Sequence, residues 1–293
     1  MLFPGALGDA VCVEPAVRHL ALGGPVEFVA RGAAAEVARL FPAQPVVHSL
    51  DDARIAELFS PIAQPGSGDP GWLDAYLRVV SFTGASSAEF VARAAAHRDA
   101  QVVPFPRRSG EGHAIDLFSA AVGAPLGLAP RLRGTGGEPG PRSPQTLCIH
   151  PGAAGAAKRF PRSFWEFVVR EAPACGFAQV CVLLGPLEAD QADAFRALAC
   201  EVVATPDVAA LASVLAVSGA FIGCDSGPGH VAAALGGAAA ILFRSTDPHR
   251  FGARGPHVDH HRMTQDPEPA VVRGWLRQLA AVALRGAGPP VVP

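Results

Sequence analysis

Residues 221–235 (FIGCDSGPGHVAAAL) place an acid, a hydroxyl residue and several glycines directly after a short apolar run. This pattern predicts a strand, a sharp turn and a helix. Ser226 and Gly227 then fall at the helix start, where free backbone N–H groups and the helix dipole attract anions. The segment is therefore suited to holding a phosphate group.

Asp225 stands immediately before this helix start, where a carboxylate would repel a bound phosphate. Its presence is explained if it accepts hydrogen bonds from hydroxyl groups beside the phosphate, as in a sugar. His230 lies in the first turn of the same helix and can reach the same pocket. The alternative is an ordinary strand–turn–helix in which Asp225 only caps the helix.

Lys158 is the only lysine among the 24 basic residues of the chain. It lies in a glycine-rich loop, residues 151–161, that follows an expected strand over residues 146–150. A lysine offers a compact point charge, whereas an arginine offers a broad planar fork. A lone lysine in an arginine-rich chain suggests a site where arginine will not serve, although chance survival would leave the same pattern.

Four such features follow expected strands: Gly8 with Asp9, the Lys158 loop, residues 185–188, and the segment that starts at Asp225. In open α/β sheets, ligands bind beyond the carboxyl ends of the strands. Lys158 and the helix-start N–H groups offer a phosphate site, Glu188 and Asp225 accept hydroxyl hydrogen bonds, and Asp9 adds an acid from the other half of the chain. This set suits a phosphorylated sugar, most simply a nucleotide-sugar.

Elements that could position these residues alternate along both halves of the chain. In the second half we expect strands over residues 146–150, 178–184, 201–204, 220–223 and 238–243, with helices between them. In the first half a helix is expected from residue 10 to residue 22, after a loop that ends at Asp9. Alternation of this kind predicts parallel sheets covered on both faces, with a ligand cleft between two α/β domains.

A glycine- and proline-rich stretch, residues 133–145 (RGTGGEPGPRSPQ), is the expected linker between these domains. We therefore expect a first domain over residues 1–140, on the acceptor side, and a nucleotide-sugar-binding domain over residues 146–267. A last helix is expected over residues 268–285, packing back toward the first domain.

Composition excludes several classes of protein. The net charge of −2, with no block of like charge, leaves no electrostatic footprint for nucleic acid. No apolar run is long enough for a bilayer span, and no charged segment precedes an apolar core as in a signal peptide. Six scattered cysteines without a Cys-x-x-Cys pair indicate buried thiols in a reducing cytoplasm.

The sequence also lacks the signatures of metal-bridged phosphate chemistry. There is no Asp-x-Asp pair and no Gly-x-x-x-x-Gly-Lys-Ser/Thr loop, so we expect no metal ion and no cofactor. Histidines at five positions invite a metal site, but residues 257–261 suggest a polar loop with solvated side chains. The five are His113, His249, His257, His260 and His261.

Three segments in order along the chain match one family. They are Gly8-Asp9 with Pro15, residues 150–161 (HPGAAGAAKRFP) and residues 225–236 (DSGPGHVAAALG). Together they resemble glycosyltransferase family 9, the ADP-heptose:lipopolysaccharide heptosyltransferases. The resemblance implies a GT-B fold, in which two Rossmann-like parallel-sheet domains face a central cleft. It departs before the lysine, where alanines replace hydroxyl residues, so phosphate contacts there would come from the backbone alone.

The resemblance also assigns roles. Asp9 would be the catalytic base, Lys158 would contact the donor diphosphate and sugar, and Glu188 would hold the adenosine ribose. The remaining donor-site residues would be Asp225, Ser226, Gly227 and His230. The family inverts the anomeric carbon without a metal ion, as an acceptor hydroxyl displaces a nucleoside diphosphate in one step.

We accordingly expect a bacterial, inverting, metal-independent glycosyltransferase that moves a heptose from ADP-heptose to a glycan hydroxyl, such as that of lipopolysaccharide core. We expect it in the cytoplasm, with at most peripheral contact with the inner face of the membrane. Two alternatives stay open: a nucleotide-sugar-binding protein without transferase activity, and a GT-B nucleotide-sugar epimerase. A binding protein would need the donor-side residues but no acid such as Asp9 from the other domain.

Overall fold

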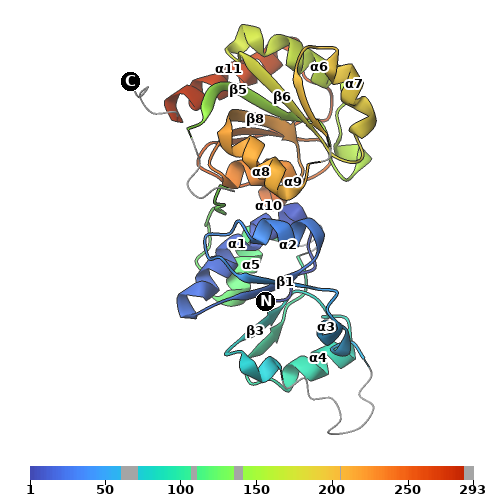
Figure 1. Ribbon diagram of the computed structural model, residues 1–293, viewed down its shortest axis with the longest axis vertical. Coiled ribbons are helices and arrows are strands. Elements are labelled where there is room, and N and C mark those ends of the chain that lie inside the picture. The colour runs from blue at the N-terminus through green and yellow to red at the C-terminus, as the bar shows by residue number, and fades with distance from the viewer. Residues whose placement is uncertain (61–71, 107–110, 135–140, 205, 287–293) are drawn as a thin grey trace. The chain divides into compact units, whose positions relative to one another are not determined.

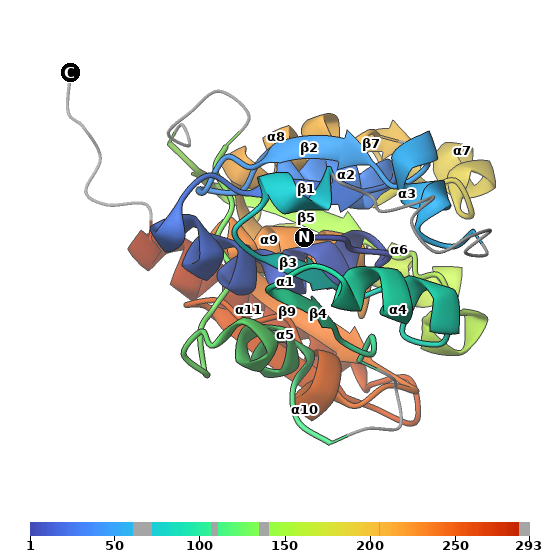
Figure 2. The same ribbon diagram turned by 90° about the horizontal axis from the view of Figure 1, so that it is seen from below.

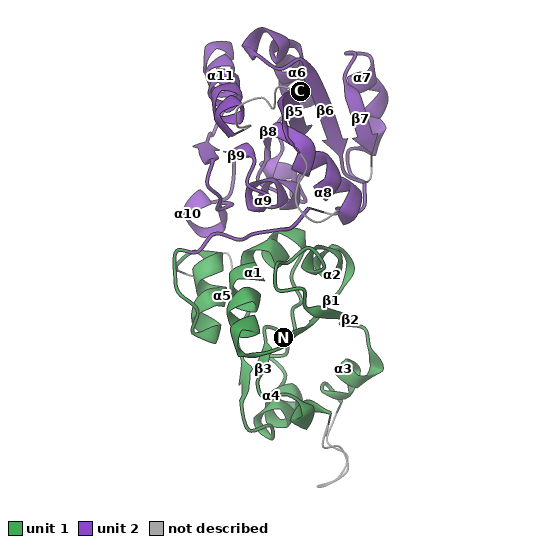
Figure 3. Cartoon of the chain, turned by 60° about the vertical axis from the view of Figure 1, so that its left-hand side comes forward, with its two compact units in different colours: residues 1–127 green, residues 128–293 purple. Residues whose placement is uncertain are grey.

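The computed structural model describes residues 1–60, 72–106, 111–134, 141–204 and 206–286. The chain divides into two compact units, residues 1–127 and residues 128–293 (Figures 1 and 3). The expected linker, residues 133–145, thus falls inside the second unit, and residues 135–140 of it lie outside the described part of the chain.

The first unit is built on short parallel strands. β1 pairs with β2, as Figure 2 shows, and β3 pairs with β4. Leu2 bridges Val29 of β1 and Ser81 of β3, so this single residue joins the two pairs. The strands are β1 (Glu27–Ala30), β2 (Val46–Ser49), β3 (Val79–Ser81) and β4 (Ala100–Val102).

Helices cover both faces of these strands because neighbouring residues point to opposite sides. Phe3 packs on Phe28 and on Phe118 of α5. Leu2 and Val29, one residue away in each case, belong to a second cluster with residues of α3 and α4. The helices are α1 (Leu7–Leu20), α2 (Gly32–Ala38), α3 (Ala53–Glu57), α4 (Ala88–Ala95) and α5 (Ala114–Val122), with short turns η1 (Ala21–Gly23) and η2 (Leu73–Ala75).

The second unit contains a six-stranded, fully parallel sheet in the order β10-β9-β8-β5-β6-β7. The chain starts in the middle at β5, runs outward to β7, returns beside β5 as β8 and runs outward again. This is the doubly wound order, and its switch point lies between β5 and β8. The strands are β5 (Ser143–His150), β6 (Gln179–Leu184), β7 (Glu201–Ala204), β8 (Ser218–Cys224), β9 (Ala238–Phe243) and β10 (Val258–Arg262).

Helices that pack on one face of this sheet form a common core with it. α11 contributes buried side chains to this core of the second unit, and its expected packing toward the first domain stays a prediction. These side chains are Val272, Leu276, Leu279, Ala280 and Ala283. The helices are α6 (Arg162–Glu171), α7 (Ala192–Arg196), α8 (Val208–Val217), α9 (Gly227–Ala234), α10 (Pro248–Phe251) and α11 (Pro269–Gly286), with turns η3 (Ala156–Lys158), η4 (Pro173–Cys175) and η5 (Ala189–Gln191).

One expectation is wrong. Residues 258–262 form edge strand β10, paired in parallel with β9, and not a polar loop. His261 stacks on Trp275 of α11 with ring centroids 4.4 Å apart, whereas His257 and His260 are exposed. His113 is buried and caps α5 by accepting a hydrogen bond from the Ile115 N–H.

Within the described ranges, no helix combines the length and the apolar character that a membrane span requires.

Candidate functional site

The switch point of the second unit brings two loops together. β5 and β8 are neighbours in register, with His150 opposite Gly223. A Cβ atom at Gly223 would lie 2.8 Å from the His150 carbonyl oxygen, so the close approach of the two strands requires glycine there. The loop after β5 carries Lys158, and the turn after β8 carries Asp225. Both predicted residues therefore lie at one edge of the sheet.

Lys158 and Asp225 are paired directly. The Lys158 Nζ lies 2.6 Å from Asp225 Oδ2, and the two side chains are 19% and 5% exposed. Thr246, which follows β9, donates a hydrogen bond from Oγ1 to the same Oδ2, also over 2.6 Å. The strand-end rule predicted one site for the lysine and the acid but not their pairing, and it missed Thr246. Thr246 follows strand β9 of the same sheet, and this position was the one sign in the sequence that it could lie at the same site.

Beside this pair lies the amino end of α9, with Ser226 in the capping position. The Ser226 hydroxyl donates to the Cys224 carbonyl oxygen over 3.0 Å and does not cap the helix. Asp225 does not cap it either, because its carboxylate is held by Lys158 and Thr246. Gly227 is the first helical residue and His230 is buried one turn inside. Neither Ser226 nor Asp225 caps the start of α9, and the backbone N–H groups of a helix start can bind an anion.

Glu188, after β6, is buried in a tight cradle of backbone. A Cβ atom at Gly152 would lie 2.4 Å from Glu188 Oε2, and one at Gly185 would lie 3.1 Å from it. Arg159 Nε lies 3.4 Å from Oε1, and no described group forms a hydrogen bond with that oxygen. Burial raises the pKa of the Glu188 carboxyl above its usual value. The surrounding backbone thus encloses the carboxyl group, and Oε1 can still accept a hydrogen bond.

His150, the last residue of β5, also lies against Gly152, with its Cε1 3.0 Å from the position of a Cβ there. Its Nδ1 donates a hydrogen bond to the Leu183 carbonyl oxygen over 2.9 Å. Burial lowers the pKa of His150 to about 4, so the imidazole is neutral at physiological pH. The sequence placed His150 in a motif but gave it no role.

Asp9 belongs to the first unit. α1 begins at Leu7 and not at residue 10, so Asp9 is the third helical residue. Its Oδ2 accepts a hydrogen bond from the Ala6 N–H over 3.1 Å. A Cβ atom at Gly5 would lie 2.7 Å from the Asp9 Cβ, so the turn before α1 is tight. Asp9 follows the central residue Leu2 by one short loop. The other six candidate residues lie in the second unit.

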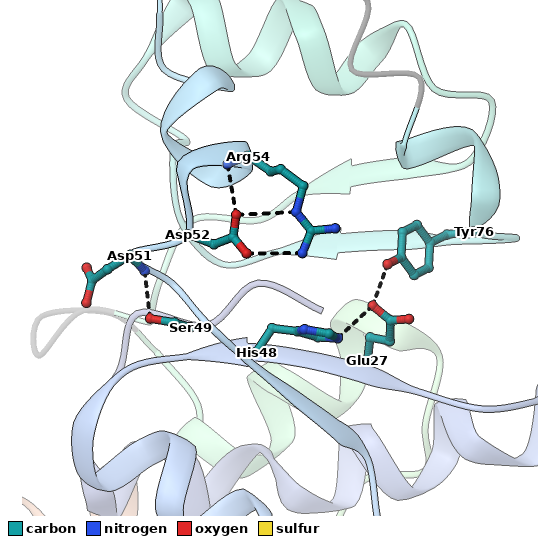
Figure 4. Close-up of polar contacts among 7 residues, drawn as sticks. All are labelled: Glu27, His48, Ser49, Asp51, Asp52, Arg54 and Tyr76. Carbon is teal, nitrogen blue, oxygen red and sulfur yellow. Dashed lines mark hydrogen bonds and ion pairs between the residues drawn. The ribbon is translucent and has the colours of Figure 1, made fainter.

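A second polar cluster, which the sequence did not predict, lines a small hollow in the first unit, and Figure 4 shows its polar contacts. The Tyr76 hydroxyl donates to Glu27 Oε2, and His48 Nε2 lies 3.0 Å from the same oxygen. Asp52 caps α3 and pairs with Arg54. Burial raises the pKa of Tyr76 to about 12. The cluster ties β1 and β2 to the segment before β3.

In neither unit do three described His, Cys, Asp or Glu side chains gather as a metal ion would need.

The doubly wound parallel sheet with a lysine–carboxylate pair at its switch point defines an open α/β fold, a class in which ligands bind beyond the carboxyl ends of the strands. Solved structures specify the fold. E. coli ADP-heptose lipopolysaccharide heptosyltransferase II is 18% identical, with a TM-score of 0.71 over 97% of this chain and 98% of that one. E. coli heptosyltransferase WaaC with ADP is 17% identical, with a TM-score of 0.68 over 95% and 98% of the two chains. The fold is therefore GT-B, as predicted.

A family model described as glycosyltransferase family 9 (heptosyltransferase) matches residues 131–278. The chain belongs to glycosyltransferase family 9, which confirms the resemblance found in the sequence. The E. coli iron-containing dodecameric glycosyltransferase TibC is also similar, at 13% identity and a TM-score of 0.54 over 98% of this chain and 74% of that one. No curated sequence is similar enough to be matched.

Proposed function

We propose that this chain is an inverting, metal-independent heptosyltransferase that moves a heptose from ADP-heptose to a glycan hydroxyl, such as that of lipopolysaccharide core. The observation that carries the proposal is the Lys158–Asp225 pair at the switch point, beside the start of α9, which neither Ser226 nor Asp225 caps. A cation, an anion-binding helix end and a buried carboxylate are what a sugar diphosphate needs at one place. Two similar structures support ADP-heptose as the donor, since one contains ADP and the other contains ADP-2-deoxy-2-fluoro heptose.

The donor would be held by groups of the second unit. Lys158 and the N–H groups at Ser226 and Gly227 would neutralise the diphosphate as negative charge builds up on it. Asp225 would accept hydrogen bonds from the sugar hydroxyls, and Glu188 from the ribose. The loop before the lysine carries alanines, so its phosphate contacts would come from backbone N–H groups.

The transfer itself would be a single displacement. The acceptor hydroxyl oxygen forms a bond to the anomeric carbon while the bond from that carbon to the diphosphate oxygen breaks, and ADP leaves. The hydroxyl proton passes to the Asp9 carboxylate. Such a general base contributes when its proton transfer accompanies bond formation, so its pKa need not be high. With the diphosphate charge balanced by Lys158 and backbone dipoles, the reaction needs no metal ion.

The experiment that tests this function is transfer from ADP-heptose to a heptose-free lipopolysaccharide core acceptor, measured in excess chelator. Asp9→Asn should lower the rate by roughly 10²–10⁴, the usual worth of general-base catalysis. Asparagine can still accept the hydrogen bond from the Ala6 N–H, so the melting temperature and the ADP affinity should stay near those of the wild type. Asp74→Asn, at an exposed acid of the same unit, is the matched control and should transfer normally.

The outcomes separate the alternatives. Wild-type transfer by Asp9→Asn would show that the base is another group. Transfer that is lost in chelator and restored by a divalent or iron ion would contradict the metal-independent mechanism. Tight ADP-heptose binding without transfer to any sugar acceptor would favour a nucleotide-sugar-binding protein.

A further inference from the structure

Asp225 is held through only one of its two carboxylate oxygens. Oδ2 receives both the Lys158 ammonium and the Thr246 hydroxyl, each over 2.6 Å. No described residue donates to Oδ1. The side chain is only 5% exposed. The carboxylate is therefore fixed in place while one oxygen is kept for a ligand.

Thr246 lies in a loop that is anchored on both sides of it. Before it, the Arg244 guanidinium lies over the Phe160 ring at 4.8 Å and donates to the Arg159 carbonyl oxygen over 3.2 Å. After it, Asp247 caps α10 by accepting from the His249 N–H over 3.0 Å. These contacts fix the backbone of the loop and hence the direction from which the Thr246 hydroxyl approaches Asp225.

Lys158 can pair with two anions, the Asp225 carboxylate and the diphosphate of the proposed donor. In the ligand-free chain its ammonium pairs with Asp225, but the proposed donor brings a diphosphate to the same edge of the sheet. A lysine has a flexible stem and a point charge, so it can turn from one anion to the other. A buried carboxylate that loses its last hydrogen-bond donor is strongly penalised. Without a second hydrogen-bond donor to Asp225, this free-energy cost would weaken the binding of the diphosphate.

We propose that Thr246 is a positioning residue that keeps Asp225 in place and hydrogen-bonded when Lys158 turns toward the donor diphosphate. This inference rests on the proposed function, because it takes a diphosphate as the ligand of Lys158. It assigns to Thr246 a role in the exchange of Lys158 between two anions, and not a contact with the reacting atoms.

The experiment is a double-mutant cycle on the full chain, with ADP as the probe. ADP affinity is measured by calorimetry up to millimolar concentration, and the melting temperature is measured without ligand. The variants are Thr246→Val, Thr246→Ser, Lys158→Ala and the double variant Lys158→Ala/Thr246→Val. Ser245→Ala, at the exposed neighbouring residue, is the matched control and should behave as the wild type.

Thr246→Val should weaken ADP binding by roughly ten- to a hundredfold, the worth of a hydrogen bond to a charged group, with a melting temperature near that of the wild type because Lys158 still pairs with Asp225. Thr246→Ser keeps the hydroxyl and should restore ADP binding. In the Lys158→Ala background the pattern should reverse. There Thr246→Val should barely change the ADP affinity but should lower the melting temperature, because Asp225 has then lost both donors.

A purely structural role for Thr246 would lower the melting temperature equally in both backgrounds, and that result would overturn the inference. Equal ADP affinity in the wild type and Thr246→Val would overturn it as well. If the wild type binds no ADP, the proposed donor is wrong and the inference falls with it. If the wild type binds ADP and only the cycle fails, the proposed function stands and this inference alone is lost.

Discussion

His150 shows how one buried residue makes the stability of the chain depend on pH. Its Nδ1 donates to the Leu183 carbonyl oxygen, and burial lowers its pKa from 6.5 to about 4. The unfolded chain therefore binds a proton at this residue more readily than the folded chain does. Stability from the neutral imidazole is complete above pH 6.5 and is lost as the pH falls from about 6.5 to about 4.

We expect His150→Asn to remove this dependence, since asparagine can keep an N–H donor near the position of Nδ1 but does not titrate. The free energy of unfolding of the wild type, taken relative to the variant, should fall by up to about 3 kcal/mol between neutral pH and pH 4. Urea denaturation at a series of pH values measures this difference. Parallel curves for the two proteins would show that His150 is not the titrating group.

Residue types and strand ends allowed the sequence to predict that Lys158 and Asp225 share a site, because the carboxyl ends of parallel strands meet at one edge of a sheet. The same rule could not single out Thr246. A threonine in a loop is ordinary, and its importance comes from a hydrogen bond to a residue 21 positions away. The roles of all seven candidate residues remain predictions, although the structure gives the surroundings of each.

Among the elements, the central strands were the easiest to predict. β8 and β9 are buried along their whole length, so they appear in the sequence as continuous apolar runs. β10 was missed because it is an edge strand with a polar sequence and only β9 as its neighbour. The start of α1 was missed because Gly8, inside the helix, resembles part of a loop.

Two glycines in different elements should respond to alanine in opposite directions. In β8, a Cβ atom at Gly219 would lie 2.5 Å from the Ser143 carbonyl oxygen and 2.6 Å from the Pro144 Cα, and neither backbone atom can easily move. Gly219→Ala should therefore cost about 1–3 kcal/mol of unfolding free energy. In α11, a Cβ at Gly274 meets nothing within 4 Å, so Gly274→Ala should stabilise by about 0.5–1 kcal/mol.

Urea denaturation of both variants and the wild type measures the two changes in the free energy of unfolding. The informative quantity is the sign of each change, because both substitutions add the same methyl group. A stabilising Gly219→Ala would mean that β5 and β8 can move apart at this point without loss.

At the scale of the whole molecule, the candidate residues are divided unequally between the units. Lys158, Glu188, Asp225 and His230 lie in the second unit, whereas Asp9 lies in the first. The second unit also has its own core, completed by α11. Its boundary falls between Gly127 and Leu128, earlier than the glycine-rich stretch suggested, because residues on the amino side of that stretch already pack with this unit. One such contact is the hydrogen bond from the Leu132 N–H to the Ala234 carbonyl oxygen.

A fragment of residues 128–286 should therefore fold alone and bind ADP with an affinity close to that of the whole chain, but it should transfer no sugar. Circular dichroism and ADP calorimetry measure the two properties. A fragment that stops at residue 268 loses the buried side chains of α11 and should not fold cooperatively. If the longer fragment folds but binds ADP far more weakly than the whole chain, the first unit contributes to the donor site.

The central place of β5 in the sheet has a consequence for how the protein is made. β5 leaves the ribosome first among the strands of its sheet, but its neighbour β8 is synthesised only after β6, β7 and the helices between them. Asp225 follows Lys158 by 67 residues, which is roughly 3–13 s of translation at ordinary bacterial rates. During that interval the lysine loop exists without its carboxylate. The two halves of the candidate site thus meet late in synthesis, when the second crossover of the chain returns to the strand with which the sheet began.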